Sequence, residues 1–175
     1  MEIEEGRLKG VRIFRPKIFR DSRGLFFELF REGRLEHAVS GFVQDNCSIS
    51  RQNTIRGMHF QRRPGQAKLV TVILGKVFDV VVDMRRDSPT FGQWEGFELS
   101  DTDYEQILIP VGFAHGFCVL SERACLLYKV SSPYDAEEEK GFCFNDREVG
   151  IQWPVDRPIL SERDRTAPSF REVVA

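Results

Sequence analysis

The sequence has few of the residues and segments that form metal sites or membrane spans. Its 175 residues include three histidines and four cysteines, and the cysteines form neither a CxxC pair nor zinc-ribbon spacing. The longest apolar runs, such as 69–74 and 77–82, are far shorter than the roughly 20 residues of a membrane helix. The acidic start, MEIEE, lacks the layout of a secretory signal. We expect a cytoplasmic protein with no membrane contact and structural thiols.

An excess of either charge is also missing. Twenty-five cations and 27 anions give a formal net charge of −2, so we expect no nucleic-acid partner. The cations are unevenly placed, because residues 46–78 contain no Asp or Glu. That stretch carries six cations: Arg51, Arg56, Arg62, Arg63, Lys68 and Lys76. A site for an anionic ligand and an ordinary solvated face are equally good interpretations of it.

Short segments rich in Val, Ile and Phe, separated by turn residues, dominate the chain and predict strands. Residues 68–74 and 77–84 are predicted to form a hairpin around Gly75, which permits the positive φ of a tight turn. A second hairpin is predicted between 113–120 and 124–130. Helix is expected only at 31–39, which contains His37, and in a short piece near the C-terminus. We predict one mainly β domain, 1–175, built as an antiparallel double-sheet jelly-roll barrel with few short helices.

One short motif bears on metal binding. Pro110, Gly112 and His115 are spaced as in the second signature of cupin barrels, in which that histidine often binds a metal. Of the first signature only His59 and Gln61 align, and Lys68 stands where a carboxylate ligand is expected. An ammonium group repels a divalent cation, so we expect neither a metal nor another cofactor.

A neutral histidine and a lysine in one barrel suit a different chemistry. His59 is a candidate general base near neutral pH, and Lys68 is a candidate partner for a developing oxyanion. Together they suit proton abstraction next to a carbonyl, with nearby arginines holding a phosphorylated handle. The alternative is that both are ordinary strand residues with unrelated partners.

Ten segments together resemble one family, the dTDP-4-dehydrorhamnose 3,5-epimerases, over about residues 11–168. They are 19–24 (FRDSRG, followed by Phe26 and Glu28), 42–46 (FVQDN), 56–61 (RGMHFQ), 66–70 (QAKLV), 78–83 (FDVVVD), 88–92 (SPTFG), 109–117 (IPVGFAHGF), 127–129 (LYK), 150–154 (GIQWP) and 160–164 (LSERD).

The resemblance implies a substrate and four catalytic residues. The substrate is dTDP-4-dehydro-6-deoxy-D-glucose, a dTDP-4-keto-6-deoxy sugar whose ketone makes the protons at C3 and C5 removable. His59 matches the base and Asp164 the carboxylate that fixes its tautomer. Tyr128 matches the acid that returns a proton on the opposite face, and Lys68 the residue beside the C4 oxygen. Without the family, Tyr128 reads as a packing aromatic and Asp164 as a helix-starting carboxylate.

The resemblance also implies a set of substrate-binding residues and a homodimer. The binding residues are Arg23, Phe26, Glu28, Gln44, Asn46, Arg56, His115, Glu139 and Arg163. The N-terminal strand region, about 11–30, is expected to cross to a neighbouring subunit, and residues 155–175 to pack on the barrel. Without the family, His115 is a structural histidine that satisfies buried polar groups.

Three departures from the family pattern stand out. Cys47 replaces a common His, Phe60 replaces a Tyr, and residues 137–140 differ around Glu139. Tyr134 is a rival acid candidate. The main functional alternative is a monofunctional 3- or 5-epimerase of a related sugar nucleotide. A metal-dependent cupin oxygenase and a non-catalytic nucleotide-sugar binder are further alternatives.

Overall fold

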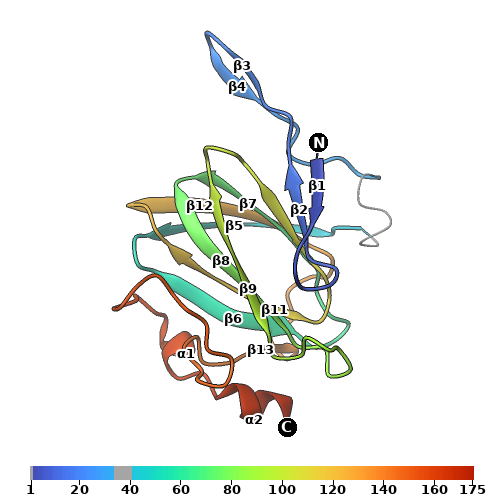
Figure 1. Ribbon diagram of the computed structural model, residues 1–175, viewed down its shortest axis with the longest axis vertical. Helices are drawn as coiled ribbons and strands as arrows, with labels where there is room; N and C mark the ends of the chain where they lie inside the picture. Colours follow the sequence, from blue (N-terminus) through green and yellow to red (C-terminus); the bar gives the residue numbers. More distant parts are fainter. Residues whose placement is uncertain (1, 34–40) are drawn as a thin grey trace.

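The computed structural model describes residues 2–33 and 41–175, which form two facing antiparallel β-sheets (Figure 1). In spatial order, the six-stranded sheet contains β1 (Glu2–Glu5), β2 (Arg12–Arg15), β10 (Gln106–Ile109), β7 (Lys68–Leu74), β12 (Arg123–Val130) and β5 (Gln44–Arg51). The five-stranded sheet contains β13 (Glu139–Gly141), β6 (Ile55–Gln61), β11 (Phe113–Val119), β8 (Lys76–Asp83) and β9 (Trp94–Ser100). The predicted mainly β, double-sheet fold is confirmed.

The main core lies between the two sheets. Alternate residues of each strand point inward, because successive side chains of a strand point to opposite faces. Val70 and Val72 of β7 and Leu126 of β12 pack with Val77 and Val81 of β8. All five are completely buried. Burial of this aliphatic layer is the main force holding the sheets together, at about 25 cal/mol per Å² of apolar surface.

Both predicted hairpins are wrong. Strand β7 pairs with β10 and β12, whereas β8 pairs with β11 and β9, so the chain changes sheets between them. The connection from β11 to β12 changes sheets in the same way. Gly75 has the expected positive φ of 79°, and a Cβ there would lie 2.1 Å from the carbonyl oxygen of Arg123. A tight corner between sheets therefore uses the same turn chemistry as a hairpin, and local sequence does not distinguish them.

The C-terminal segment covers the outer face of the five-stranded sheet. It contains α1 (Glu162–Arg165) and α2 (Phe170–Val174), which confirms the short helix predicted near the C-terminus (Figure 1). A capping box between Ser169 and Glu172 begins α2. Phe170 is 2% exposed and stacks against Phe91 and Phe142. This packing fixes the segment that carries Asp164.

The other predicted helix, 31–39, falls mostly on residues 34–40, including His37, which lie outside the described residues. Residues 32 and 33 form a turn rather than a helix.

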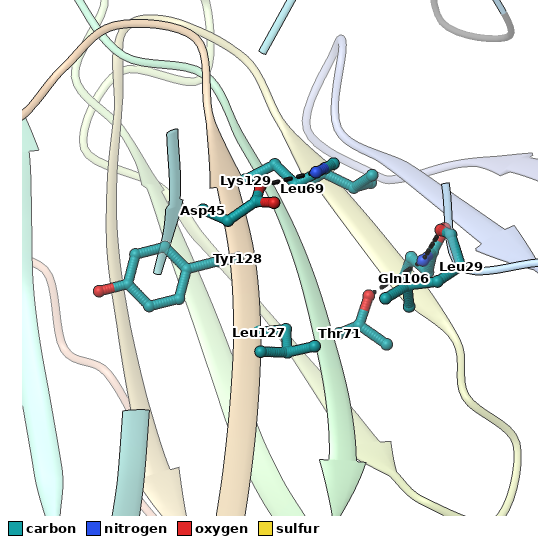
Figure 2. Close-up of a pocket in the computed structure, with 8 residues that line it drawn as sticks. All are labelled: Leu29, Asp45, Leu69, Thr71, Gln106, Leu127, Tyr128 and Lys129. Carbon is teal, nitrogen blue, oxygen red and sulfur yellow. Dashed lines mark hydrogen bonds and ion pairs between the residues drawn. The ribbon is translucent and has the colours of Figure 1, made fainter. Parts of the chain in front are cut away.

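Near the N-terminus a small hairpin projects away from the barrel (Figure 1). It consists of β3 (Phe19–Asp21) and β4 (Gly24–Phe26). The chain then returns across the outer face of the six-stranded sheet, where Gln106 Nε2 donates to the carbonyl oxygen of Leu29 over 2.7 Å. A small apolar cavity of about 80 Å³ lies under this crossing, and the ring of Tyr128 points away from Thr71 and Gln106 (Figure 2).

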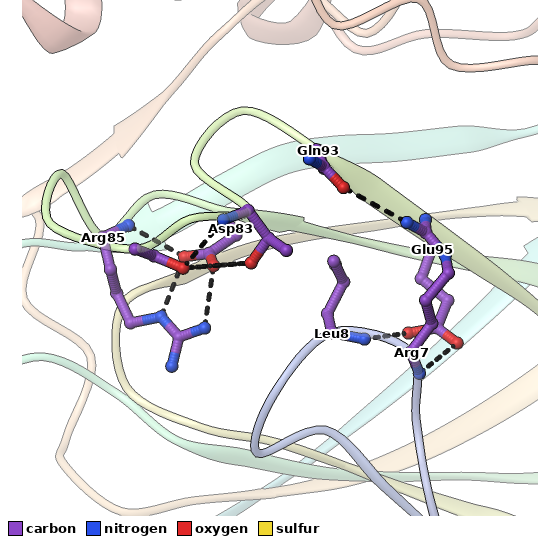
Figure 3. Close-up of polar contacts among 8 residues, drawn as sticks. Arg7, Leu8, Asp83, Arg85, Gln93 and Glu95 are labelled. Carbon is purple, nitrogen blue, oxygen red and sulfur yellow. Dashed lines mark hydrogen bonds and ion pairs between the residues drawn. The ribbon is translucent and has the colours of Figure 1, made fainter.

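Polar contacts of Glu95 and Asp83 secure two loops of the barrel (Figure 3). Glu95 accepts the backbone N–H groups of Arg7 and Leu8 over 2.8 and 2.9 Å, which ties the N-terminal loop to β9. Asp83 is fully buried and accepts from Arg85 and from the hydroxyls of Ser88 and Thr90. These bonds outweigh the effect of burial and hold the pKa of Asp83 far below its usual range.

Within the part of the chain that the structure describes, no helix is long and apolar enough to cross a bilayer.

Candidate active site

A cavity of about 590 Å³ opens between the two sheets, beside the C-terminal segment. Its volume is in the range of small-molecule binding sites. Nine of the thirteen residues singled out from the sequence line it: Asn46, Arg56, His59, Lys68, His115, Tyr128, Glu139, Arg163 and Asp164. Segments as distant in sequence as β5 and α1 therefore contribute to one site.

His59 and Asp164 form a hydrogen-bonded pair on one wall. His59 lies on β6, and its Nε2 is 2.6 Å from Oδ1 of Asp164 on α1. The imidazole is partly open to the cavity, with 24% of its side chain exposed, whereas Asp164 is buried. Because Nε2 is engaged by the carboxylate, Nδ1 is the ring nitrogen left for an acid–base role.

Several donors keep Asp164 ionised. Burial by itself would raise the pKa of its carboxyl, but the hydrogen bond to His59 and those from Ser161 and the backbone N–H of Gly57 lower it below its usual value. Ser161 is also the N-cap of α1, where its Oγ accepts the backbone N–H of Asp164. The cap therefore fixes both the helix and the carboxylate behind His59.

A second histidine–carboxylate pair lies next to the first. His115 on β11 is the register partner of His59 on β6. Its Nε2 is 2.8 Å from Oδ2 of Asp79, which is completely buried. The sequence reasoning gave Asp79 no role, although it lies within one of the matching segments. Asp79 and His115 are 36 residues apart in the sequence, so no local pattern predicts their pairing.

Lys68 stands on the opposite wall, at the start of β7, and is 8% exposed. Its burial lowers the pKa to about 8, while the negative charges of Glu139 and Asp79 act in the other direction. An ammonium group poised near neutral pH in a poorly hydrated site interacts strongly with a developing negative charge.

Tyr128 shares that wall with Lys68. On the paired strands β12 and β7, Tyr128 is opposite Val70 and Val130 is opposite Lys68, so the side chains of Tyr128 and Lys68 are diagonal neighbours on the inner face. Burial raises the pKa of the Tyr128 phenol, so it stays protonated at neutral pH. A proton donor on β12 thus faces a proton acceptor on β6 across the cavity.

Two cations of the site are held in position by neighbours. Arg56 Nε donates to Oγ of the buried Ser50 over 3.0 Å. Arg163 forms an ion pair with Glu139 of β13. Both guanidinium groups line the cavity, and arginine is suited to bidentate binding of phosphate.

Only two of the six cations in residues 46–78 therefore belong to the cavity. Arg56 and Lys68 line the cavity, and Lys76 pairs with Glu98 instead. The remaining three cations, Arg51, Arg62 and Arg63, are exposed elsewhere.

Gln44 lies at the border of the site. Its Nε2 donates to Asn46 Oδ1 over 2.8 Å, and its Oε1 accepts the backbone N–H of Tyr134 over 3.3 Å. Tyr134 lines the cavity from the loop after β12 and is 57% exposed. Sequence reasoning considered this residue only as a rival acid.

The chain does not bring three of the sequence-predicted residues to its own cavity. Arg23 lies at the turn of the β3–β4 hairpin and pairs with Asp21 over 2.6 Å. Phe26 is 69% exposed, and Glu28 pairs with Arg31. The hairpin that carries the first two projects away from the barrel (Figure 1).

Other lining residues were missed as individuals. Gln66, Phe117 and Ser161 occur within matching segments without a role, and Ser48 carried no signal beyond strand alternation. Cys47 is exposed and approaches Cys125 of the adjacent strand, with 3.5 Å between the sulfur atoms.

Across residues 2–33 and 41–175, no three His, Cys, Asp or Glu side chains are grouped so that they could hold a metal ion. The carboxylates nearest to the two histidines are instead committed to hydrogen bonds with them. The expectation of a metal-free, cofactor-free site stays a prediction.

Comparison with known proteins gives a consistent result. The family model described as dTDP-4-dehydrorhamnose 3,5-epimerase matches residues 5–172. A protein of that name from Pseudomonas aeruginosa is 49% identical over 166 residues, covering 93% of this chain and 92% of its own. A Legionella pneumophila enzyme, solved in complex with dTDP-4-keto-L-rhamnose, is 42% identical with a TM-score of 0.93, over 97% of this chain and 93% of that chain.

The same fold also occurs in an enzyme described as inverting one carbon. A 3′-monoepimerase from Streptomyces bikiniensis, solved with dTDP-quinovose, is 33% identical with a TM-score of 0.91, over 97% of this chain and 90% of that chain.

Proposed function

Because this chain belongs to the dTDP-4-dehydrorhamnose 3,5-epimerase family, we propose that it inverts C3 and C5 of dTDP-4-dehydro-6-deoxy-D-glucose. The product is dTDP-4-dehydro-L-rhamnose. One observation carries the proposal. The cavity is lined from one sheet by His59 of β6, which pairs with Asp164 of α1, and from the other sheet by the Tyr128 phenol of β12. Inversion at carbon needs a base on one face of the sugar and an acid on the other.

The proposed chemistry is general acid–base catalysis through an enolate. The C4 ketone makes the hydrogens at C3 and C5 acidic, and His59 removes them. Asp164 holds the ring in one tautomer and stabilises the imidazolium that forms. Lys68 stabilises the negative C4 oxygen, and Tyr128 returns a proton from the opposite face.

The remaining cavity residues bind the nucleotide in this proposal. Arg56 and Arg163 offer guanidinium groups to the diphosphate. Asn46, His115 and Glu139 supply polar contacts, with Gln44 holding Asn46 in place.

We further propose a homodimer in which each hairpin β3–β4 serves the cavity of the partner. Phe19, Leu25 and Phe26 are all exposed apolar residues on a hairpin that projects from its own barrel. Strand β5, which carries Asn46 along the cavity, is the last strand of its sheet. Its outer edge can accept an added strand. Docking there would bring Arg23, Phe26 and Glu28 of the partner to the site.

We also propose a cytoplasmic location, because all four cysteines are free thiols and thiols persist in a reducing compartment.

Solvent exchange tests the proposed reaction. The protein is incubated with the 4-keto sugar nucleotide in D2O, and we expect deuterium at both C3 and C5 by NMR and mass spectrometry. Deuterium at one carbon alone would identify a monofunctional epimerase, the activity of the Streptomyces bikiniensis relative. If neither carbon exchanges, the chain is not an epimerase of this sugar.

Two variants assign the roles of base and acid. His59→Ala should abolish exchange, because it removes the proposed base, and the other histidine of the cavity, His115, has only 8% of its side chain exposed and is held by Asp79. Tyr128→Phe should retain exchange at C3 or C5 but slow inversion, because abstraction remains while the opposite-face donor is lost. Tyr134→Phe is the matched control and should invert both carbons at a rate near that of the parent.

A further inference from the structure

Two of the four cysteines are neighbours on the six-stranded sheet. Cys47 on β5 is opposite Leu127 of β12, and Cys125 on β12 is opposite Ile49 of β5. The two cysteines are therefore diagonal partners on one face of a strand pair. Their sulfur atoms are 3.5 Å apart, in contact but not bonded, and both are free thiols.

The two thiols differ in access to solvent. Cys47 is exposed and can meet a dissolved reagent, whereas Cys125 is 8% exposed. Desolvation, together with the hydrogen bond to Cys47, raises the pKa of Cys125, so it is the less reactive thiol towards solutes. In such a pair the accessible thiol reacts with the oxidant, and the sheltered thiol then attacks the modified sulfur to form a disulfide.

We propose that Cys47 and Cys125 are a modification site at which an oxidised low-molecular-weight disulfide, such as oxidised glutathione, forms an intramolecular disulfide. The Cys47 thiolate attacks one sulfur of the reagent, forms a mixed disulfide and releases one thiolate. Cys125 loses its proton and attacks the Cys47 sulfur, releasing the second thiolate. Two protein thiols are oxidised to one disulfide, and one external disulfide is reduced to two thiols.

The bond requires only local rearrangement. The sulfur atoms must approach from 3.5 Å to the covalent distance of about 2.05 Å, which side-chain rotation and a small adjustment of the strand pair can supply.

The cross-link also bears on the proposed active site. Asn46 and Tyr128 are register partners on the same two strands, one position along from Cys47 and Leu127. Drawing the strands together at Cys47 displaces these two side chains relative to each other. We expect the oxidised protein to turn over the 4-keto sugar nucleotide several-fold more slowly, and reductant to restore the rate; this coupling rests on the proposed function.

Thiol chemistry tests the site without any activity assay. The full-length protein is equilibrated with mixtures of oxidised and reduced glutathione, alkylated, and mapped by non-reducing peptide mass spectrometry. We expect loss of two hydrogens and a linked pair of peptides containing Cys47 and Cys125. Cys143→Ser removes a partly exposed thiol that donates to Asn145, and this control should form the same link.

Single variants separate the steps. Cys125→Ser should stop at the mixed disulfide on Cys47, and Cys47→Ser should form neither product. If Cys125→Ser folds poorly, the exposed Cys47→Ser variant still decides. A stable mixed disulfide in the parent protein, or a link between two chains, would overturn the proposal. A correct link with unchanged turnover would overturn its coupling to the active site.

Discussion

At the residue scale, the carboxylate behind His59 determines which ring nitrogen carries the proton. Asp164→Asn keeps the shape of the side chain but removes its charge, so it neither holds the same tautomer nor stabilises the imidazolium. We expect kcat to fall by about 10²–10⁴-fold with little change in KM. Glu162→Gln, an exposed neighbour in the same helix, is the control. Retention of kcat by Asp164→Asn would show that the pair is structural.

Lys68 gives the proposed reaction an alkaline limit. Its burial lowers the pKa to about 8, so above that pH the folded protein loses the ammonium group that faces the enolate. We expect kcat/KM to decline as pH rises through about 8, and Lys68→Met to lose activity at every pH. A pH profile of the parent that stays flat to pH 10 would contradict this role.

The same residue affects stability in the opposite sense. Lys68 binds a proton more weakly in the folded state, where its pKa is about 8, than in the unfolded state, where its pKa is 10.5. Its contribution to the free energy of unfolding therefore increases with pH between about 8 and 10.5. Lys68→Met should therefore be more stable than the parent at pH 7, by about 1–3 kcal/mol. Urea unfolding at pH 7 and pH 10 measures this difference in unfolding free energy, which should be smaller at pH 10. Lys76→Met, at a more exposed lysine, is the control.

Much of this residue-level assignment followed from sequence, and its limits are physical. His59, Lys68 and Tyr128 lie in strands with recognisable motifs, and all three line the cavity. Asp79 could not be paired with His115 from spacing, because the contact depends on how β8 lies against β11.

At the scale of elements, the strands were more predictable than their partners. Segments rich in Val and Ile and bounded by turn residues placed β7 and β8 correctly to within a residue or two. Their pairing was mistaken, since Gly75 permits a sharp turn in a hairpin and in a corner between sheets alike. Which strand lies beside β7 is decided by β10 and β12, which follow it by more than 30 residues.

Anchoring of the C-terminal segment is the element-level property most open to mutation. Phe170 is buried against Phe91 and Phe142, and truncation would leave a cavity there. Phe170→Ala should lower the free energy of unfolding by about 3–5 kcal/mol in urea denaturation. Arg171→Ala, whose side chain is 85% exposed, should change it by less than about 0.5 kcal/mol. Equal effects of the two variants would show that α2 does not hold the segment in solution.

At the scale of the whole molecule, the proposed exchange of hairpins is tested by mixing inactive chains. One chain carries His59→Ala with an intact hairpin, and the other carries Arg23→Ala with Phe26→Ala and an intact His59. After joint unfolding and refolding in equal amounts, half of the dimers are mixed and each mixed dimer has one complete site. We expect about a quarter of the parent activity to return.

The control mixes two preparations of the His59→Ala chain, which should stay inactive. If the mixture of different variants also stays inactive while light scattering shows mixed dimers, each chain builds its site alone. Sequence motifs placed Arg23 and His59 in one site only through family resemblance, because no pattern within a chain reveals a contact made between two chains.

The outer edge of β5 has a consequence for any shortened form of the protein. In the proposed homodimer, a protease that removed the first 30 residues would take away the β3–β4 hairpin that covers the partner's β5, together with β1 and β2, which pair beside β10. It would leave rows of unsatisfied amide and carbonyl groups along β5 and β10. Such a row is a template for lateral growth. The truncated protein should therefore form insoluble fibrils on storage, so the projecting hairpin would also act as a guard against aggregation.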